Sequence, residues 1–164
     1  PFLLKLSRIY RDARRLHGNG PYKDHLWFCV RAGGEDWTGR PTFYFEIGPD
    51  YYSYGMGFWA PKAALMEAYR NAVDEHPEVL EKLVKRFNKQ AQFTLSGPEY
   101  ARKKTAPSPL LAAWYNKKSI NLQHDAAPDE RMFSPETAQD IIEGFRTLMP
   151  LYKYFDALCA AEMV

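Results

Sequence analysis

Runs of aromatic and β-branched residues, separated by glycine, proline and aspartate, dominate the first third of the chain. Such runs are typical of β-strands, and the polar breaks between them are typical of turns. We predict an antiparallel meander of strands at residues 25–31 (HLWFCVR), 42–47 (TFYFEI) and 51–59 (YYSYGMGFW). A fourth strand is predicted at residues 6–12 (LSRIYRD), joined to the meander through an Asn19–Gly20 turn.

The spacing of apolar residues becomes helical after Trp59. Pro61 suits a first helical turn, and the apolar positions that follow it are Leu65, Met66, Tyr69 and Val73. Pro77 opens a second predicted helix, whose apolar positions are Val79, Leu80, Leu83, Val84 and Phe87. The pattern therefore predicts a pair of helices after the strands.

The last third of the chain is less regular until residue 134. Residues 93–104 fit either a strand or a loop, residues 109–116 a short helix, and residues 118–123 an extended segment. Ser134 is predicted to cap a C-terminal helix that begins at Pro135. Pro150 should kink or break this helix, which we expect to continue through residues 151–161.

Strand alternation assigns the side chains to two faces of the sheet. The apolar face, which is expected to carry the helices, is formed by Leu26, Phe28, Val30, Phe43, Phe45, Ile47, Tyr52, Met56 and Phe58. The other face is mixed polar and aromatic and is formed by His25, Trp27, Cys29, Arg31, Thr42, Tyr44, Glu46, Tyr51, Ser53, Gly55 and Gly57. We therefore predict one α+β domain over residues 1–164, a curved antiparallel sheet of four or more strands with helices packed on one face.

The composition is that of an ordinary globular domain of 164 residues, although 15% aromatic residues is a rich content. No apolar run is long enough to cross a membrane and no signal peptide pattern is present, so we expect a cytoplasmic location. Cys29 and Cys159 are isolated, which favours neither a disulfide nor a zinc site. Residue 1 is proline rather than methionine, so we expect that an upstream segment is missing.

Positive charge is concentrated in blocks, although the net charge is only +2. Residues 1–31 carry seven basic and two acidic side chains, and residues 81–104 carry the same numbers. Residues 8–25 (RIYRDARRLHGNGPYKDH) alone hold four arginines, a lysine and two histidines. Because two acids cannot neutralise this segment, we predict a binding site for a small phosphate or carboxylate anion.

The predicted site lies on the polar face of the sheet. Its anion-binding residues are predicted to be Arg8, Tyr10, Arg11, Arg14, Tyr22 and Lys23. His25 is predicted to be the general acid or base, and Glu46 the carboxylate that orients it. Glycines within a strand indicate a bend or the close approach of another group, such as a ligand or a packed loop. The pocket lining is therefore predicted to be Tyr44, Ser53, Gly55, Gly57 and Trp59.

Two alternative functions stay open at this point. In the first, the protein is a structural or interaction module, Arg8 and Arg11 form internal ion pairs with Asp12 and Glu46, and Arg14 is solvated. In the second, the protein binds nucleic acid. The basic patch would then extend through Arg14, Arg15, Arg31 and residues 81–104, with Trp27 and Tyr44 as stacking platforms.

The sequence contains no motif for a metal or a cofactor. The histidines lack metal-ligand spacing, at His17, His25, His76 and His124. Neither a dinucleotide fingerprint nor a phosphate-cradling loop occurs. We therefore predict no metal and no cofactor, and the sequence leaves the oligomeric state and the question of enzyme activity open.

A series of motifs resembles the microbial family catalogued as domain of unknown function 2461. The motifs are RIYRDARR, PYKDH, FYFEIGP, YGMGFWAP, KKSI and FSPETAQDIIEGFRTLMPLYKYF, between about residue 6 and residue 155. The resemblance implies an α+β domain of this type, with no established activity. It also implies that the family's motif positions are occupied here by Arg8, Tyr10, Arg11, Asp12, Arg14, Pro21, Tyr22, Lys23, His25, Glu46, Gly57, Trp59 and Pro61.

Two stretches depart from the family's pattern. The sequence LHGNG stands where members usually have a lysine-containing polar stretch, and Tyr54–Gly57 stands where they usually have a run of glycines. Both lie at the predicted pocket, so the ligand of this chain can differ from that of its relatives. Members also usually carry a helical N-terminal region, which agrees with the expectation of a missing upstream segment.

Overall fold

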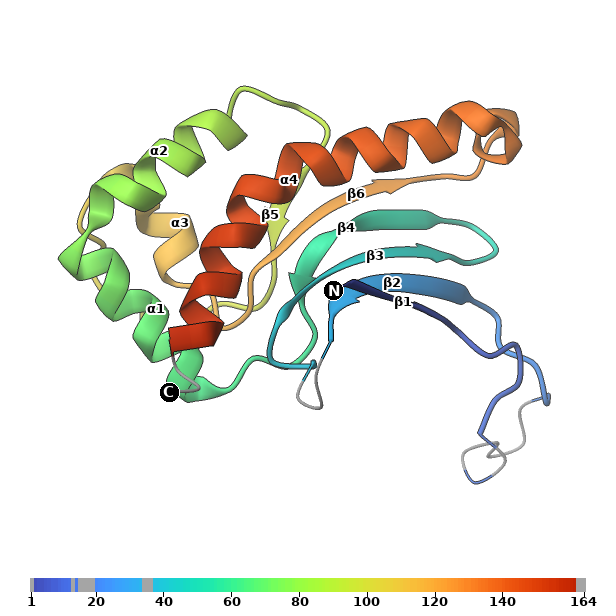
Figure 1. The fold of residues 1–164 in the computed structure, drawn as a ribbon, viewed down its shortest axis with the longest axis horizontal. Helices are drawn as coiled ribbons and strands as arrows, with labels where there is room; N and C mark the ends of the chain where they lie inside the picture. The colour runs from blue at the N-terminus through green and yellow to red at the C-terminus, as the bar shows by residue number, and fades with distance from the viewer. Residues whose placement is uncertain (1, 13, 15–19, 34–36, 162–164) are drawn as a thin grey trace.

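The fold is an α+β arrangement built on one open antiparallel sheet (Figure 1). The computed structural model describes residues 2–12, 14, 20–33 and 37–161. The strand order is β1-β2-β3-β4-β6-β5. The strands are β1 (Phe2–Leu6), β2 (Leu26–Ala32), β3 (Pro41–Ile47), β4 (Tyr52–Phe58), β5 (Thr94–Ser96) and β6 (Asn121–Ala126).

The helices follow the meander in the chain. The longer ones are α1 (Ala63–Glu75), α2 (Pro77–Phe87) and α4 (Pro135–Ala161). Shorter turns are η2 (Pro109–Leu111), α3 (Ala112–Tyr115) and η3 (Glu130–Phe133). The predicted fold class, an antiparallel sheet of at least four strands with helices on one face, is confirmed.

The three meander strands are confirmed to within a residue at each end, but the predicted strand at residues 6–12 is wrong. The edge strand lies earlier in the chain, at β1, where Leu4 and Leu6 lie opposite Val30 and Phe28. Apolar residues that match the apolar row of β2 extend the sheet more favourably than the charged run that follows them. Asn19 of the Asn19–Gly20 turn predicted to join the two strands lies outside the described residues.

The irregular part of the chain contributes the other edge of the sheet. The extended segment predicted at residues 118–123 contains the first half of β6, which pairs with β4 along its whole length. Residues 93–104, which fitted a strand or a loop, contain the short strand β5 at the outer edge. Residues 109–116 form the predicted short helix as η2 and α3.

The C-terminal helix α4 runs through Pro150 without a break in its assignment. Figure 1 shows that its axis bends along its length, so the kink expected at a proline within a helix is present. Ser134 directly precedes the helix with an extended backbone, and its carbonyl oxygen accepts a hydrogen bond from the amide of Thr137 at 3.2 Å. The bend lets α4 cover the sheet with one half and reach α1 with the other.

The core lies between the helices and the apolar face of the sheet, as the alternation predicted. Phe43 on β3 stacks on Tyr152 of α4 at a centroid distance of 4.9 Å and contacts Phe145 at 4.8 Å. Met56, Tyr69 and further apolar side chains of β4, α1 and α2 are almost completely buried beneath them. The opposite, polar face is the concave side of the arched strands and points away from α4 (Figure 1).

Candidate functional site

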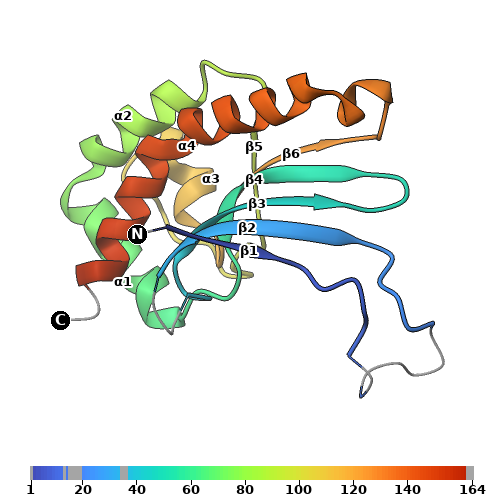
Figure 2. The same cartoon turned by 45° about the vertical axis from the view of Figure 1, so that its right-hand side comes forward.

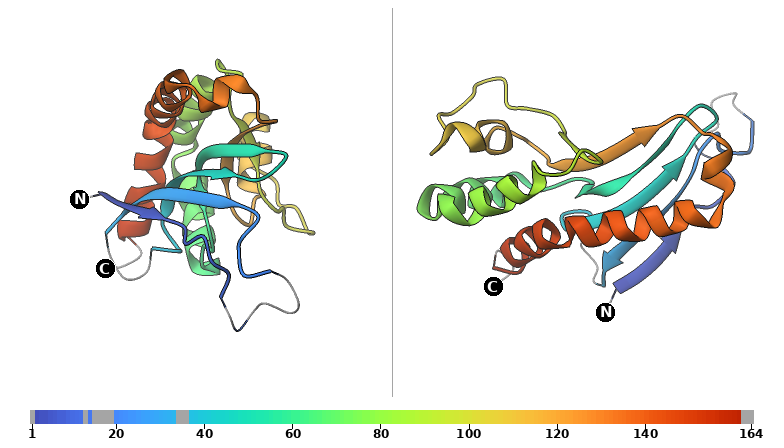
Figure 3. Two further views of the ribbon diagram at one scale, coloured as in Figure 1. Left: turned by 90° about the vertical axis from the view of Figure 1, so that its right-hand side faces the viewer. Right: turned by 90° about the horizontal axis from the view of Figure 1, so that it is seen from above.

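Beyond the ends of β1 and β2 the chain continues as a projecting hairpin. We define the hairpin arm by its described residues, 7–12, 14 and 20–25. Its backbone hydrogen bonds run from Ser7 N to Trp27 O at 2.8 Å, from Lys23 N to Ile9 O at 2.9 Å and from Arg11 N to Pro21 O at 2.8 Å. Figure 2 and the left view of Figure 3 show the arm extending from the sheet on the side away from the helices.

A β-bulge separates the arm from the sheet. The Ser7 amide bonds to the Trp27 carbonyl oxygen, and Tyr10 pairs with Tyr22. Between these two pairings the first segment advances three residues and the second segment five. The second segment therefore holds two more residues than the first, and residues 24–25 lie within this interval. Bulges redirect side chains and are frequent beside functional sites. The bulge thus places an adjacent carboxylate and imidazole at the base of the arm.

These two side chains form a pair that an arginine extends. His25 Nδ1 lies 2.8 Å from Oδ1 of Asp24, and Arg11 Nη2 lies 3.5 Å from Oδ2 of the same carboxylate. Arg11 Nε also donates to the Tyr22 carbonyl oxygen at 2.7 Å. The hydrogen bond from His25, with a smaller contribution from the charge of Arg11, lowers the pKa of Asp24. An ionised Asp24 fixes the proton on Nδ1, so Nε2 is the ring nitrogen that can exchange a proton with another molecule.

A second carboxylate pair lies nearby at the end of the β3–β4 hairpin. The Tyr51 hydroxyl donates a hydrogen bond to Oε1 of Glu46. This hydrogen bond, followed by partial burial, raises the pKa of Tyr51 to about 12, and the charge of Asp24 acts on the same phenol. Glu46 is therefore engaged by Tyr51, and the carboxylate that orients His25 is Asp24 rather than the predicted Glu46.

Lysine and arginine side chains on the polar face lie over tryptophan rings and form cation–π contacts. Lys23 Nζ lies 6.0 Å from the centroid of the Trp27 ring, and Lys5 Nζ lies 5.1 Å from that of Trp37. The Arg31 guanidinium lies 5.0 Å from the same Trp37 ring. Among the described residues, neither Lys5 nor Lys23 has a carboxylate within ion-pair distance. Both ammonium groups are therefore held in place by attraction to an aromatic ring and keep their charge for a further partner.

Among the remaining predicted anion-binding residues, the side chains of Arg14, Tyr10 and Tyr22 form contacts of their own in the described part of the chain, and Tyr22 joins the group through its carbonyl oxygen alone. Arg14 forms a bidentate pair with Asp12, at 2.8 and 3.0 Å, and this pair raises the pKa of the guanidinium. Arg8 is exposed. Tyr10 and Tyr22 are exposed and contact each other, with ring centroids 5.3 Å apart. Arg15, named for the nucleic-acid alternative, lies outside the described residues.

For the alternative of a structural or interaction module, the arginines were predicted to pair with Asp12 and Glu46, and the structure shows different partners. Asp12, predicted beside Arg8 or Arg11, pairs with Arg14, and the carboxylate beside Arg11 is Asp24. Each of these pairs is partly exposed to solvent. Exposed ion pairs of this kind contribute little to stability.

The predicted pocket lining divides into three parts. Tyr44 and Ser53 are neighbours on the polar face, with hydroxyl oxygens 3.4 Å apart, and burial raises the pKa of Tyr44. Trp59 is exposed beyond the far end of β4, away from His25. Gly55 and Gly57 lie against β6: a Cβ at Gly55 would overlap the carbonyl oxygen of Leu122, and one at Gly57 would overlap the Asn121 side chain. The close approach that requires these glycines is thus made by the neighbouring strand.

Four residues of this site were not singled out from the sequence. Asp24 could have been found from its position directly before His25, because adjacent acid and imidazole side chains can pair locally. Tyr51 was assigned to the polar face, but its partner depends on the β3–β4 turn. Lys5 and Trp37 come together only through the pairing of β1 with β2, which the misplaced strand concealed.

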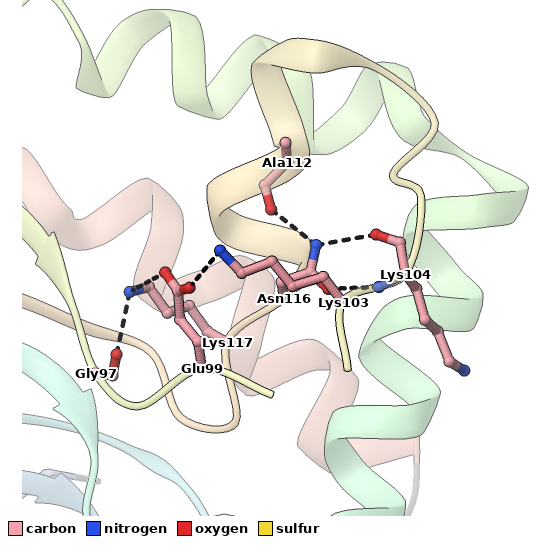
Figure 4. Close-up of polar contacts among 7 residues, drawn as sticks. All are labelled: Gly97, Glu99, Lys103, Lys104, Ala112, Asn116 and Lys117. Atoms are coloured by element: carbon pink, nitrogen blue, oxygen red, sulfur yellow. Dashed lines mark hydrogen bonds and ion pairs between the residues drawn. The ribbon is translucent and has the colours of Figure 1, made fainter. Parts of the chain in front are cut away.

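The KKSI motif builds a separate polar cluster on the helix side of the molecule (Figure 4). The nearly buried Lys117 ammonium donates to the Gly97 carbonyl oxygen at 3.0 Å and pairs with Glu99 at 3.1 Å. Glu99 also pairs with Lys103 at 3.0 Å, and the lysine contacts lower the pKa of this carboxyl. A buried ammonium with these partners is compensated.

Asn116 completes this cluster by fixing the loop backbone. Its side chain accepts from the Lys104 amide at 2.9 Å and donates to the carbonyl oxygens of Lys104 and Ala112 at 3.0 and 3.1 Å (Figure 4). Asn116 and Lys117 therefore anchor the loop after β5 against α3. From the basic block at residues 81–104, the cluster engages the Lys103 side chain with Glu99, whereas Lys104 contributes its backbone.

Neither a metal-binding cluster nor a membrane-spanning helix occurs among the residues that the structure describes. Within them, His, Cys, Asp and Glu side chains form no group of three or more that could hold a metal ion. None of the described helices is long and apolar enough to cross a membrane.

Comparison with known proteins identifies a family. The family described as "Conserved hypothetical protein (DUF2461)" matches residues 3–154, which is most of the chain. No curated protein matches the chain.

Proposed function

Because the chain belongs to this DUF2461 family, whose description names no activity, we propose a function from the geometry of its own site. The protein binds a small phosphorylated or carboxylated molecule on the concave face, at the base of the hairpin arm. His25 is placed to transfer a proton to or from that molecule. The observation that carries the proposal is the oriented and solvent-accessible imidazole beside a lysine that has no acidic partner among the described residues.

The anion-binding part of the proposal rests on the lysines. An ammonium that is held over an indole ring is fixed in position but not neutralised, because the ring supplies only partial negative charge. Lys23 follows Tyr22 directly, and Arg11 bonds to the Tyr22 carbonyl oxygen, so both cations belong to the same bulged segment. A phosphate or carboxylate at this point would contact the ammonium of Lys23 and the guanidinium of Arg11, whose charge is partly neutralised by Asp24.

The proton-transfer part rests on the Asp24–His25 pair. A carboxylate on Nδ1 sets the tautomer and the orientation of an imidazole and stabilises its protonated form. The His25 side chain is 39% exposed, so a ligand can reach the other ring nitrogen. The Tyr51 phenol lies close enough to feel the charge of Asp24, and its single proton is donated to Glu46, so His25 is the proton-transferring group of the site.

Thermal unfolding with inorganic phosphate, sulfate, succinate and AMP tests the binding step. A ligand at 100 times its Kd would stabilise the chain by about 2.7 kcal/mol, or about 5–10 °C in melting temperature. The shift should be lost in Lys23→Gln. It should persist in Lys82→Gln, a matched change of an exposed lysine on α2. The absence of a shift with every anion, or equal shifts in both variants, would contradict the proposal.

Aromatic rings carrying cations also favour a second candidate function, the binding of single-stranded nucleic acid. Trp27 with Lys23, and Trp37 with Lys5, are combinations that stack on bases and contact phosphates. This function would require affinity for a short oligonucleotide that falls steeply with salt, in proportion to the number of phosphates contacted. A single phosphate of a small ligand would instead give a shallow dependence on salt.

If the protein is instead a structural or interaction module, the expected effect of substituting Arg11 is the opposite. If the arginine serves only to hold the arm, Arg11→Ala lowers the melting temperature and changes no anion-induced shift. If it belongs to the binding site, the anion-induced shift decreases, and the melting temperature without ligand changes little because the Arg11–Asp24 pair is partly exposed. The same thermal-shift series distinguishes these outcomes.

A further inference from the structure

A row of polar side chains crosses the concave face beside the proposed anion site. The strand register places four residues side by side on β2, β3, β4 and β6, namely Trp27, Glu46, Ser53 and Asp125. Directly opposite residues of paired strands project to the same face of a sheet, and neighbouring strands lie about 4.8 Å apart. The row therefore begins at the indole that carries Lys23 and runs across the concave side of the strands (Figure 1).

The next positions along β3 and β6 add a phenol and an amide to this row. The Tyr44 hydroxyl lies 3.4 Å from Oγ of Ser53, and the Gln123 amide donates to Oδ2 of Asp125 at 2.6 Å. Burial has the largest effect in raising the pKa of Tyr44, and the charges of Asp125 and Glu46 raise it further, so both carboxylates lie near this phenol. We define the polar strip by Tyr44, Glu46, Ser53, Gln123 and Asp125.

The two carboxylates of the polar strip keep their negative charge. Among the described residues, neither Glu46 nor Asp125 has a lysine, arginine or histidine within ion-pair distance. Oε1 of Glu46 accepts from Tyr51 and Oδ2 of Asp125 accepts from Gln123, so each carboxylate retains one oxygen that no described donor occupies. These oxygens are acceptors available to a ligand, because an ionised carboxylate accepts several hydrogen bonds and donates none.

The concave face is thus divided by charge along the row. One end holds the cations Lys23 and Arg11, and the polar strip beside it holds two carboxylates without cations. A second anionic group on the same ligand would be repelled by the strip, whereas an O–H group would donate a hydrogen bond to it. The division therefore favours a ligand with one anionic end and a neutral, hydroxyl-bearing body over an extended polyanion.

The neutral members of the strip distinguish hydroxyl groups from ammonium groups. Tyr44, Ser53 and Gln123 can each donate and accept hydrogen bonds, and a ligand hydroxyl can do the same. An ammonium group only donates, so it would suit the carboxylates but leave the donors of these three side chains without a partner. The mixed strip is accordingly better matched by a polyol than by an amine.

We propose that the ligand is a phosphorylated or carboxylated sugar, whose acidic group binds at Lys23 and whose hydroxyl groups bind the polar strip. The inference rests on the proposed function, because it takes the anion site at the base of the arm as its starting point. Glu46 and Ser53 lie one and two strand spacings from Trp27, or about 5 and 10 Å, and Asp125 lies one spacing farther. Glu46 is thus the carboxylate closest to the acidic group of a single sugar.

Isothermal titration calorimetry with inorganic phosphate, glucose 6-phosphate and phosphoethanolamine tests this inference. The wild type should bind glucose 6-phosphate at least tenfold more tightly than inorganic phosphate, because hydrogen bonds to charged acceptors contribute at least this factor. In Glu46→Gln the preference should fall below threefold, while the affinity for inorganic phosphate stays equal or rises. The matched control Glu67→Gln changes an exposed glutamate on α1 and should keep the wild-type preference.

Three results would overturn the inference and leave the anion site intact. They are equal affinities of the wild type for glucose 6-phosphate and inorganic phosphate, a preference that survives in Glu46→Gln, and tighter binding of phosphoethanolamine than of glucose 6-phosphate. Circular dichroism should show that both variants are folded. If the wild type binds neither inorganic phosphate nor glucose 6-phosphate, the proposed function itself fails, and the assignment of a sugar fails with it.

Discussion

Substitution of the β4 glycines tests directly whether they serve a ligand or the packing of the sheet. A Cβ at Gly55 would overlap the Leu122 carbonyl oxygen and lie 3.0 Å from the carbonyl carbon, so backbone must move. A Cβ at Gly57 would chiefly overlap the Asn121 amide oxygen, which is the end of a side chain. A Cβ added at Gly20 would have no atom within 4 Å. The structure therefore predicts a graded loss of stability for alanine at these three sites.

The magnitudes follow from the kind of atom that must move. Overpacking typically costs about 1–3 kcal/mol, and a rigid backbone neighbour places Gly55→Ala near the upper end. Replacing glycine restricts the unfolded chain and returns about 0.4–1 kcal/mol. The net loss for Gly55→Ala is then about 2 kcal/mol, or about 4–8 °C in melting temperature for a chain of this size. Gly57→Ala should cost about 1 kcal/mol, and Gly20→Ala should stay within about 0.5 kcal/mol of the wild type.

Urea unfolding monitored by tryptophan fluorescence, without any added anion, measures these losses. Asn121→Ala in the Gly57→Ala background provides a further check, because it removes the overlapping amide and should restore part of the stability. A neutral Gly55→Ala, or a Gly57→Ala that costs more than Gly55→Ala, would refute the reasoning. Either result would reopen the interpretation of the glycines as the floor of a ligand pocket.

Two further predictions concern tyrosine hydroxyls. Tyr115→Phe should destabilise the chain by about 1 kcal/mol, because the Tyr115 hydroxyl donates a hydrogen bond to Asp74 at 2.9 Å. Tyr69→Phe should be neutral or stabilising, because the buried Tyr69 hydroxyl has no hydrogen-bond partner among the described residues. The urea midpoints of the two variants and the wild type measure this difference. The hydrogen bond to Glu46 raises the pKa of Tyr51 from 10.0 to about 12, so its stabilising effect is complete below pH 10 and is lost as the pH rises toward 12. The stability advantage of the wild type over Tyr51→Phe should accordingly shrink over that interval, and a constant difference in urea midpoint would show that this hydrogen bond does not form.

The parts of the fold that depend on local patterns could be predicted from the sequence. Alternating residues located β2, β3 and β4 and assigned their apolar face correctly, because each neighbour in a meander is also the next strand in the chain. The apolar positions named for α1 coincide with its buried residues. Local periodicity decides such elements because their partners are close in sequence.

The position of β6 could not be predicted in this way. It pairs with β4 across more than sixty residues, and only tertiary packing selects that neighbour. The edge strand was misplaced for a related reason: the arginine-rich run after Leu6 contains alternating apolar residues, but its partner segment carries the bulge. A two-residue change of register is invisible in the sequence of either segment alone.

The candidate site shows the same limit at the level of single side chains. The sequence pointed to His25, Arg11 and Lys23, and the structure places all three in or beside the bulged base of the arm. Their partners were assigned differently because the partner of an arginine depends on side-chain geometry after the bulge. The choice of Asp24 over Glu46 is an example, since Glu46 is taken by a tyrosine from the next turn.

The insertion of β6 between β4 and β5 has a consequence for how the chain is made. When a ribosome has released the first sixty residues, the meander can already form, yet the inner edge of β4 then has no neighbour. That edge stays open while some sixty more residues are translated, and nascent chains with open edges are prone to associate with one another. Slow elongation between α1 and β6 should therefore lower the yield of native protein, whereas pauses after residue 126 should be harmless.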